Sequence, residues 1–309
     1  MKVLIVASLN SGNFSPFVTE QAETIKKYGC QIDYYGVEGK GILGYYSNRS
    51  KLLEKIHSFQ PDLIHAHYGL SGLCANLQRQ VPVVTTYHGS DIHSGGWIFR
   101  LSQLAIKLSA YNIFISKKLK ELSGAHQTNT TIIPCGIDME TIHDMPRHEA
   151  KRLIKRDKPF VLFSGSFTND VKNPILAKEA MAKVDDAELV ELRGYTRQEV
   201  NLMMNAGDCL LMTSHREGSP QVIKEAMACG TPVVSVNVGD VKEIMGDTEG
   251  CYIAERNPDD IAEKIRMALA FKAKTNGRQR IIDLGLSNDL VAKRLLSIYE
   301  ELLKRHSTQ

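Results

Sequence analysis

Several features that mark other classes of protein are missing from this sequence. Its six cysteines are scattered and form no CxxC pair, and most of them lie among apolar neighbours, as free cysteines do in a reducing compartment. The apolar run at the N-terminus, MKVLIVASLN, is too short for a signal peptide, and no segment is long enough to span a membrane. We therefore expect a cytoplasmic protein.

A large excess of charge of either sign is missing too. The formal net charge is +3, which is too mild to indicate binding of nucleic acid, although it is compatible with an anionic small ligand or an anionic membrane surface. No low-complexity segment and no short repeat occurs. The length of 309 residues, with 43% hydrophobic and 24% charged residues, predicts a soluble globular protein of two ordinary domains.

What the chain does contain is a regular alternation of strands and helices. Residues 3–7 are predicted to form a short apolar strand, 8–15 a polar loop with Gly12, 16–28 a helix and 31–36 a second strand. This order is the opening of a parallel α/β unit. The loop is not a GxGxxG fingerprint, although its glycine allows a ligand to approach the backbone closely.

The alternation continues in two separate series. The first is predicted to have an exposed loop at 37–50, strands at 63–69, 83–87, 112–116 and 132–134, and helices at 51–59, 71–79, 98–110 and 117–122. Residues 138–158, which include the basic run KRLIKRDK, are expected to connect the series as solvated surface. The second is predicted to have strands at 160–164, 188–194, 209–214, 233–236 and 251–254, helices at 174–184, 198–206, 220–229 and 258–270, and an amphipathic helix at 288–305.

The stretch 215–240, HREGSPQVIKEAMACGTPVVSVNVGD, places Glu217 in a loop and Glu225 in the helix that follows. Ser219 is a favourable N-cap, and Pro220 suits the first helical position. Helical periodicity predicts that Lys224 points away from the apolar face and that Glu225 lies on its border. An isolated helix of this kind would simply carry a solvated glutamate. The alternative is a ligand site, with the helix N-terminus for a phosphate and carboxylates for hydroxyls.

Other polar residues favour the ligand site. Lys172 follows the first strand of the second series, just before a helix whose N–H groups could meet a phosphate. Arg193 and Gly194 end the next strand, and Glu217 follows the strand after that. These residues therefore map to one rim of one parallel sheet, where such sheets bind ligands.

At this point the sequence resembles a known family. The block EGSPQVIKEAMACGTPVV resembles the E-x7-E signature of the retaining, GT-B-fold glycosyltransferases of family 4. The resemblance extends to VLFSGSFTNDVKN, ELRGY, FISKKLKE, IIPCGID and PDLIHAHYG, and so covers most of the chain from about residue 60 to residue 270. The E-x7-E block is the specific part, and the motifs HGSD and IPCGID are weaker.

The resemblance implies catalytic roles for three residues, Lys172, Glu217 and His88. Lys172 matches the lysine that neutralises the diphosphate as the glycosidic bond breaks, and such charge stabilisation is expected to dominate catalysis. Glu217 would hold hydroxyls of the transferred sugar. His88 would lie beside the reacting sugar and position it.

The resemblance also implies a set of donor-binding residues. Glu225 would accept hydrogen bonds from the ribose hydroxyls, the base would stack near Gly194, and Gly12 would approach the phosphates when the cleft closes. Backbone N–H groups of the E-x7-E helix would meet the sugar or the diphosphate, with help from the helix dipole. The full set is Glu225, Gly12, Gly165, Ser166, Arg193, Gly194, Ser219, Pro220, Gln221 and Val222.

The chain departs from the family pattern at two positions. The family usually has an arginine six positions before the lysine, where this chain has Ser166, so one phosphate-binding charge is missing. Arg193 or Arg216 could replace it. Pro220 stands where the family often has a residue with a free N–H. Both departures bear on donor specificity.

The histidines admit another interpretation. His65 and His67 at a strand end, with His88, Asp91 and His93, could form a metal cluster like that of a TIM-barrel hydrolase. Only about five strands precede the connection, however, and no later histidines supply the other ligands. We expect one of His65 and His67 to be packed and the other exposed. No DxD pair occurs, which fits a metal-independent transferase, and no cofactor is predicted.

We therefore predict an α/β protein of GT-B architecture, in which two Rossmann-like domains face each other across a cleft. Residues 1–145 would bind the acceptor, and residues 146–287 would bind the nucleotide sugar. Residues 288–309 would form a C-terminal helix that crosses back to the first domain. The protein is expected in the cytoplasm, and peripheral association with the inner face of the membrane is left open.

The predicted reaction is retaining hexosyl transfer from a nucleotide sugar, with UDP favoured over GDP. The acceptor would be a glycan or a lipid-linked glycan of polysaccharide or lipopolysaccharide assembly. Because no covalent nucleophile is evident, front-face attack is favoured, with the leaving phosphate taking the acceptor's proton. The alternatives are a GT-B sugar-nucleotide epimerase or phosphorylase, a catalytically silent nucleotide-sugar-binding subunit and, more remotely, the metal hydrolase.

Overall fold

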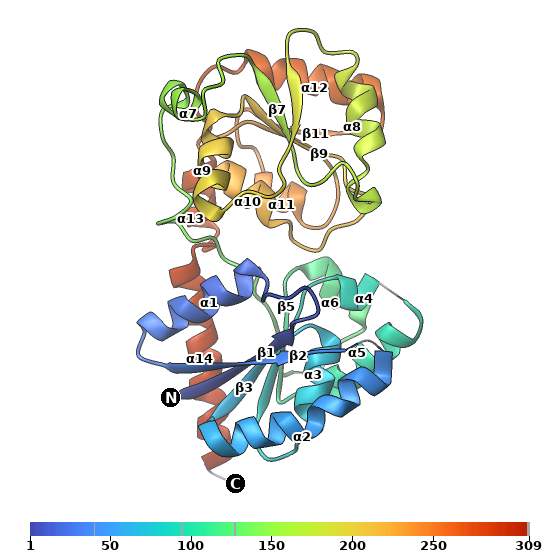
Figure 1. The fold of residues 1–309 in the computed structure, drawn as a ribbon, viewed down its shortest axis with the longest axis vertical. Coiled ribbons are helices and arrows are strands. Elements are labelled where there is room, and N and C mark those ends of the chain that lie inside the picture. Colours follow the sequence, from blue (N-terminus) through green and yellow to red (C-terminus); the bar gives the residue numbers. More distant parts are fainter. Residues whose placement is uncertain (40, 94, 127, 308–309) are drawn as a thin grey trace. The chain divides into compact units, whose positions relative to one another are not determined.

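The computed structural model describes residues 1–39, 41–93, 95–126 and 128–307. The chain forms two compact units, one of Met1–Gly136 with Asn288–Gln309 and one of Ile137–Ser287. Each unit holds one parallel sheet with helices on both faces (Figure 1). The prediction of two Rossmann-like α/β domains is therefore confirmed. In the described residues no helix combines the length and the apolar character that a membrane span needs.

The sheet of the first unit has the strand order β2-β1-β3-β4-β5-β6, and every neighbouring pair is parallel. Its strands are β1 (Lys2–Ser8), β2 (Gln31–Val37), β3 (Leu63–His67), β4 (Val83–Tyr87), β5 (Tyr111–Phe114) and β6 (Thr130–Ile132). The chain goes from β1 to one side and then returns past it to β3. The loop after β1 therefore lies at a switch point of the topology, where α/β sheets place ligands.

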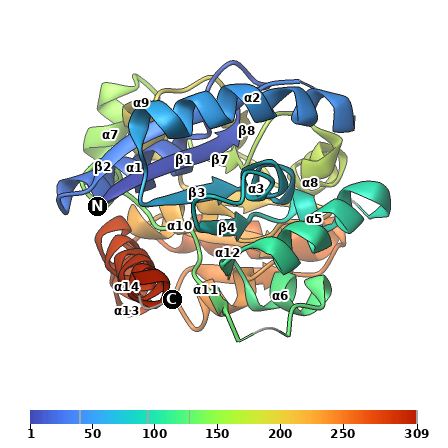
Figure 2. The ribbon, with the colours of Figure 1, turned by 90° about the horizontal axis from the view of Figure 1, so that it is seen from below.

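Helices cover both faces of this sheet (Figure 2). They are α1 (Pro16–Lys27), α2 (Gly41–Phe59), α3 (Gly69–Asn76), α4 (Ser90–His93), α5 (Gly96–Leu108), α6 (Lys117–Ser123) and α14 (Asn288–Ser307). Residues of α1 and α14 share one apolar cluster with β1, and residues of α2 and α3 share another on the opposite face. The amphipathic C-terminal segment thus buries Val291, Leu295 and Tyr299 in the first unit.

The prediction of a loop at 37–50 is wrong for its second part, because α2 begins at Gly41. Lys40 lies outside the described residues. The buried side chain of Asn48 explains the difference, since its amide donates to the carbonyls of Glu38 and Gly44 at 2.7 and 2.6 Å and its oxygen accepts from the hydroxyl of Tyr35 at 3.0 Å. These contacts outweigh the low helix propensity of the glycines in this segment.

The sheet of the second unit has the order β11-β10-β9-β7-β8 and is also parallel. Its strands are β7 (Phe160–Phe163), β8 (Glu188–Glu191), β9 (Cys209–Met212), β10 (Val233–Val236) and β11 (Cys251–Ala254). Its helices are α7 (Arg147–Leu153), α8 (Pro174–Met181), α9 (Arg197–Ala206), α10 (Gln221–Ala228), α11 (Val241–Met245), α12 (Pro258–Ala270) and α13 (Gly277–Asp283). β7, β9 and β10 are fully buried apolar strands, as the interior of a parallel sheet requires.

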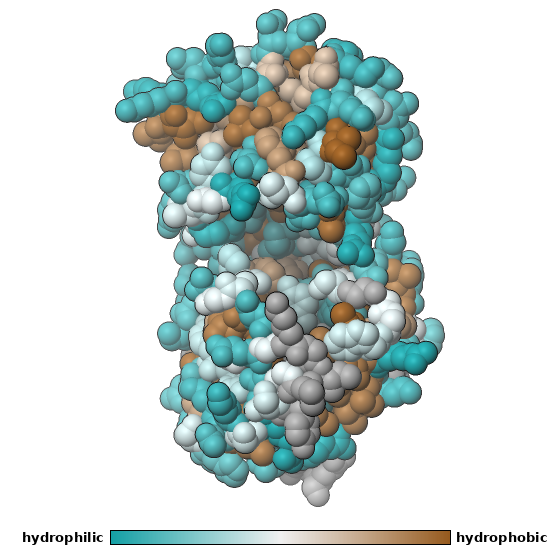
Figure 3. All heavy atoms as spheres, turned by 45° about the vertical axis from the view of Figure 1, so that its right-hand side comes forward, coloured by the Kyte–Doolittle hydropathy of each residue, from teal (hydrophilic) through white to brown (hydrophobic). Residues whose placement is uncertain are grey.

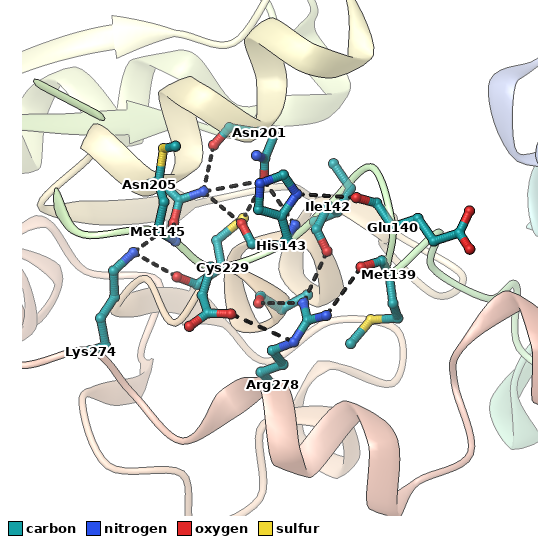
Figure 4. A network of polar contacts seen from close by, with 12 residues as sticks. Met139, Glu140, Ile142, His143, Met145, Asn201, Asn205, Cys229, Lys274 and Arg278 are labelled. Atoms are coloured by element: carbon teal, nitrogen blue, oxygen red, sulfur yellow. Dashed lines mark hydrogen bonds and ion pairs between the residues drawn. The ribbon is translucent and has the colours of Figure 1, made fainter. Parts of the chain in front are cut away.

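The interpretation of residues 138–158 as the connection between the two series is wrong, because this segment is part of the second unit (Figure 4). The Asn201 side chain accepts from the backbone N–H of His143 at 3.0 Å, and that of Asn205 accepts from Met145 at 2.8 Å. Arg278 donates to carbonyls of the same segment at 3.0 and 3.1 Å. The structural boundary therefore follows Gly136 and lies earlier than the predicted boundary after residue 145.

The basic run KRLIKRDK, residues 151–158, keeps most of its charged side chains exposed, as predicted. Only its first three residues belong to α7, where Lys151 pairs with Asp208 at 2.8 Å. Elsewhere hydrophilic residues cover most of the face shown in Figure 3, with apolar areas between them. Large apolar side chains that stay exposed include Trp97, Leu104 and Leu153.

Candidate active site

The carboxyl edge of the second sheet gathers the residues singled out in the second half of the sequence. Lys172 lies in the loop after β7, Arg193 just beyond the end of β8, and Glu217 in the loop after β9. Because all strands are parallel, these three loops leave the sheet at the same edge. Helix α10, which carries Glu225, begins directly after the third loop.

Lys172 and Glu217 form an ion pair, with 2.7 Å between Nζ and Oε1. Their loops are tied together by two further contacts. The Thr213 hydroxyl donates to the Lys172 carbonyl at 2.9 Å, and the His215 N–H donates to the Val171 carbonyl at 2.9 Å. A Cβ on Gly165 would lie 2.9 Å from Cγ of Lys172, so only glycine lets the lysine side chain cross this backbone. The ammonium group is therefore fixed over the loop after β7.

Glu225 is 6% exposed and is paired with a residue that sequence reasoning missed. Nη1 of Arg197, the first residue of α9, lies 2.7 Å from Oε1 of Glu225. A carboxylate has about four acceptor positions, so this bond fixes its orientation and leaves capacity for other hydroxyl donors. The sequence contains a usable signal, because α9 follows β8 and so begins at the same sheet edge.

The loop after β7 also touches the end of β8. Nη1 of Arg193 donates to the Ser166 hydroxyl at 3.3 Å, and that hydroxyl lies 2.9 Å from the Thr168 hydroxyl. Gly194 follows with a φ of +79°, and nothing lies within 4 Å of the position where its Cβ would be. The backbone at Gly194 is thus open to a flat group, and Arg193 reaches the position where the family carries its arginine.

The start of α10 differs from its prediction. Its N-cap is Pro220 and its first residue is Gln221, whereas Ser219 was expected to cap the helix. The Ser219 hydroxyl is buried and makes no hydrogen bond within the part of the chain described. It lies beside Asp240. Gln221 and Val222 lie in the first turn of α10, at the end of the helix that carries the positive pole of its dipole.

The prediction that Lys224 points away from the apolar face is wrong, because Lys224 is 0% exposed. Its ammonium donates to Oε1 of Gln221 at 2.9 Å. Burial raises the pKa of Asp240, and the charge of Lys224 opposes that shift. Asp240, whose negative charge is near Lys224, follows β10. A helical wheel of α10 cannot reveal this residue, because it lies outside the helix. Lys224 and Asp240 are thus opposite charges close enough to interact.

Arg256 supports the loop after β9 through its backbone carbonyls. Nη2 of Arg256, just after β11, donates to the carbonyls of Ser214 and His215 at 2.8 and 3.2 Å. Sequence reasoning missed Arg256, since it follows the last strand of the sheet and belongs to none of the motifs. Its contacts satisfy carbonyls that leave β9 and fix the direction in which the chain enters the loop.

The first unit holds the two remaining predicted residues, Gly12 and His88. Gly12 lies in the turn after β1, with a φ of +87° and open space around it. His88 follows β4, and its ring lies between Phe17 and Tyr68, with centroid distances of 4.7 and 4.6 Å. Since Phe17 belongs to α1, the start of α1 packs against this histidine at the carboxyl edge of the first sheet.

His88 is the outer member of a row of histidines. Its Nε2 lies 3.0 Å from Nδ1 of His67, and its Nδ1 lies 3.6 Å from Sγ of Cys135. The expectation that one of His65 and His67 is exposed is wrong, because both are buried. Burial lowers the pKa of His67 to about 3, so its ring is neutral. A neutral neighbour fixes the orientation of the His88 ring without adding charge.

The geometry of this row gives the metal hypothesis no support. His65 uses both ring nitrogens, at 2.8 Å from the Thr86 hydroxyl and 2.6 Å from the Tyr299 hydroxyl. The buried Asp91 accepts from the backbone N–H groups of Gly69 and Gly89 at 3.0 and 2.8 Å. Across the residues that the structure describes, no group of three or more His, Cys, Asp or Glu side chains is arranged to hold a metal ion.

Comparison with known proteins agrees with this architecture. The profile of the family described as Glycosyltransferase Family 4 matches residues 19–141, and that of Glycosyl transferases group 1 matches residues 143–270. Sucrose-phosphate synthase from Thermosynechococcus elongatus has a TM-score of 0.86 at 17% identity, and the match covers 99% of this chain and 100% of that one. The structure of HepE from Anabaena in complex with UDP-glucose has a TM-score of 0.74 at 15% identity, with 100% of both chains covered.

Curated relatives are more similar in sequence. TuaC of Bacillus subtilis, a glycosyltransferase named for teichuronic acid biosynthesis, is 26% identical over 247 residues, which are 68% of this chain and 62% of TuaC. The D-inositol 3-phosphate glycosyltransferase of Geodermatophilus obscurus is 27% identical over 268 residues, covering 68% of this chain and 59% of that protein. The chain thus spans about three fifths of the length of these relatives.

The two parallel-sheet units, with an E-x7-E helix at the edge of the second sheet, define a protein of the GT-B class. Within that class, the chain belongs to glycosyltransferase family 4.

Proposed function

We propose that this protein is a retaining glycosyltransferase that moves a hexose from a nucleotide sugar to a glycan or lipid-linked glycan in polysaccharide assembly. The observation that carries the proposal is the rim of the second sheet. There a lysine, two oriented carboxylates and the N-terminus of α10 lie on loops that leave the same edge of the sheet. Cations and helix N-termini suit a diphosphate, and fixed carboxylates suit the hydroxyls of sugars.

The proposed donor is a UDP-sugar. HepE, which has this fold, binds UDP-glucose, and TuaC is named for a polysaccharide pathway. In the donor complex the ribose hydroxyls would donate to Glu225, and the base would lie against the open backbone at Gly194. The Lys172 ammonium, which is paired with Glu217 in the free protein, would then meet the diphosphate. Glu217 would be released to accept hydroxyls of the sugar.

The proposed chemistry breaks the bond between the anomeric carbon and the diphosphate oxygen while the acceptor oxygen attacks from the same face. The leaving phosphate oxygen takes the proton of the acceptor hydroxyl, so the products are the glycoside and the nucleoside diphosphate. Lys172 and the N–H groups of Gln221 and Val222 stabilise the negative charge that develops on the diphosphate. His88 positions the sugar. No metal ion or cofactor has a role, so a chelator should leave the rate unchanged.

The proposed acceptor lies at a membrane, and the surface that fits one is the outer face of α5. Trp97, Arg100, Leu104 and Lys107 are all exposed and recur at the spacing that places them on one side of the helix. The opposite side buries Ser102, Ala105 and Ile106. A stripe that mixes Trp and Leu with cationic side chains suits the interface of an anionic bilayer. We propose that this face binds the cytoplasmic leaflet.

The test of the reaction is a thermal-shift panel with UDP, GDP, ADP and their sugar conjugates, followed by product analysis. One diphosphate and its sugar conjugate should raise Tm well above the others. Release of that diphosphate should require a glycan acceptor. Conversion of the donor without an acceptor would indicate an epimerase, and sugar phosphate formed with added phosphate would indicate a phosphorylase. Binding without turnover on any acceptor would indicate a silent subunit.

A further inference from the structure

A nucleoside diphosphate carries two or more negative charges, and so far only the ammonium group of Lys172 has been described as a positive charge that could meet them. Lys172 contributes one positive charge, and in the free protein Glu217 lies 2.7 Å from it. A second cation is therefore needed where the β-phosphate would meet the loop after β7, and Ser166 cannot supply it. Four arginines lie on the loops of this edge, and their contacts distinguish them.

Two of the four are engaged elsewhere. Arg197 lies 2.7 Å from Glu225, so its charge is used to orient that carboxylate. Arg256 donates to the carbonyls of Thr213, Ser214 and His215, so its N–H groups are occupied by the backbone. A guanidinium held by a buried carboxylate or by several carbonyls cannot turn to a ligand without losing those bonds.

Arg193 is the arginine that reaches the loop after β7. The register of the sheet pairs Phe163 with Glu191, so the residues that follow the two strands leave the sheet at the same level. Nη1 of Arg193 lies 3.3 Å from the Ser166 hydroxyl. Oε2 of Glu191 accepts from the Phe167 N–H at 2.8 Å, which holds the loop against β8.

The positive charge of Arg193 can also bind a phosphate. Among the described residues it pairs with no carboxylate, and its contact with Ser166 is a neutral hydrogen bond that a phosphate oxygen could replace. In the same loop, the stem of Lys172 lies against Gly165. The two cations therefore reach neighbouring residues of one loop, Gly165 and Ser166.

We propose that Arg193 is the second cation of the donor diphosphate site and takes over the role of the side chain at position 166. The inference rests on the proposed function. It specifies that the second positive charge at the diphosphate belongs to a residue that follows β8 and directly precedes Gly194, whose backbone is proposed to contact the base. A planar guanidinium there can hold two phosphate oxygens at once.

The experiment moves the positive charge from position 193 to position 166. Affinity is measured for the nucleoside diphosphate selected by the thermal-shift panel and for its nucleoside, in Arg193→Ala, in Ser166→Arg and in the double variant. Arg193→Ala should weaken diphosphate binding about tenfold or more and change nucleoside binding less than about twofold, as expected for loss of one exposed charged contact. The double variant should recover most of the loss, because it returns an arginine to the same phosphate.

Arg216→Ala is the matched control, since Arg216 is an exposed arginine on the neighbouring loop beside Glu217. It should bind the diphosphate as the unmodified chain does. Equal diphosphate affinity in Arg193→Ala and the unmodified chain overturns the inference, as does a loss in Arg216→Ala instead. If the double variant does not regain diphosphate affinity, the side chains at positions 193 and 166 do not reach the same phosphate, and the inference is overturned. If the unmodified chain binds none of UDP, GDP and ADP, the proposed function fails, not this assignment.

Discussion

At the scale of single residues, the two carboxylates of the E-x7-E block are held by different partners, and this separates their expected effects. Glu225 is buried and paired with Arg197, away from the bond that is broken. Glu225→Ala should therefore weaken donor binding, about 10- to 100-fold for the loss of charged hydrogen bonds to the ribose. Lys172→Ala should mainly lower kcat, about 100-fold, because its charge acts on the developing diphosphate.

Isothermal titration with the donor and steady-state kinetics separate these effects. Arg156→Ala is a suitable control, since Arg156 pairs with Glu188 at the amino-terminal edge of the second sheet, away from the loops of the rim. Unchanged affinity in Glu225→Ala together with an unchanged rate in Lys172→Ala would falsify the assignment of the rim as the donor site.

The opposite charges of Lys224 and Asp240 give a prediction about pH. Burial raises the pKa of Asp240 in the folded protein, so the folded state binds more protons than the unfolded state between the two pKa values, and stability falls as pH rises through that range. Lys224 opposes the shift. Lys224→Met should therefore destabilise the protein by about 1–3 kcal/mol at pH 7, because the Asp240 carboxylate loses the opposite charge near it.

The loss in Lys224→Met should shrink toward pH 3, where Asp240 becomes protonated in both states. Urea unfolding at the two pH values measures it. The double variant Lys224→Met with Asp240→Asn should be more stable at pH 7 than Lys224→Met alone, since no charge is left without a partner. An equal loss at both pH values would mean that Lys224 contributes through packing and not through its charge.

At the scale of elements, α5 carries the prediction about the membrane. Trp97 and Leu104 are 47% and 43% exposed on its outer face, and their loss leaves its buried side intact. Trp97→Ser with Leu104→Ser should reduce co-sedimentation with vesicles of anionic phospholipid about tenfold or more, since each buried apolar side chain contributes about 1.5–3 kcal/mol. Thermal stability should stay the same.

Leu153→Ser is the control for loss of an exposed leucine away from α5, because Leu153 is 52% exposed on α7 in the second unit. It should leave vesicle binding unchanged. Binding should also fall with vesicles of neutral lipid and with added salt, because Arg100 and Lys107 act through charge. Equal sedimentation of the double variant and the unmodified chain would remove α5 as the membrane face.

Elements with a strong local pattern could be predicted from the sequence, and those defined by distant contacts could not. The strands at Phe160–Phe163 and Val233–Val236 are apolar runs bounded by turn residues, and both were predicted. The first turns of α2 depend on Asn48 binding Glu38 and Gly44, which the glycine-rich sequence conceals. The short helices α4, α11 and α13 were missed as well, since each has less than two turns or little periodicity.

The same distinction applies to the candidate site. The position of Lys172, Arg193 and Glu217 on one rim follows from the order of parallel strands, so sequence alone could indicate it. Which side chains pair could not be foreseen, because Arg197 with Glu225 and Lys224 with Asp240 depend on how neighbouring loops approach. The prediction that Lys224 points away from the apolar face failed for this reason, because Asp240 lies at the start of α11, in a different part of the chain.

At the scale of the whole molecule, each unit has its own core, and the C-terminal helix belongs to the first one. The helix is held there by the fully buried Tyr299, whose hydroxyl lies 2.6 Å from Nδ1 of His65. The two units are therefore expected to lose structure separately when one core is damaged, and a nucleotide should protect only the unit that binds it.

Tyr299→Ala tests this organisation. It removes a buried ring, leaves His65 without one of its partners and should destabilise the first unit by about 3–5 kcal/mol. Hydrogen exchange followed by mass spectrometry should show faster exchange in peptides from β1, β3 and α14, and unchanged exchange in peptides from residues 137–287. Tyr195→Ala, at an exposed tyrosine, should change neither set. The selected nucleoside diphosphate should slow exchange in the second unit of Tyr299→Ala as much as in the unmodified chain. Faster exchange throughout both units would mean that they fold as one cooperative body, and the C-terminal helix would then be a support for the whole chain.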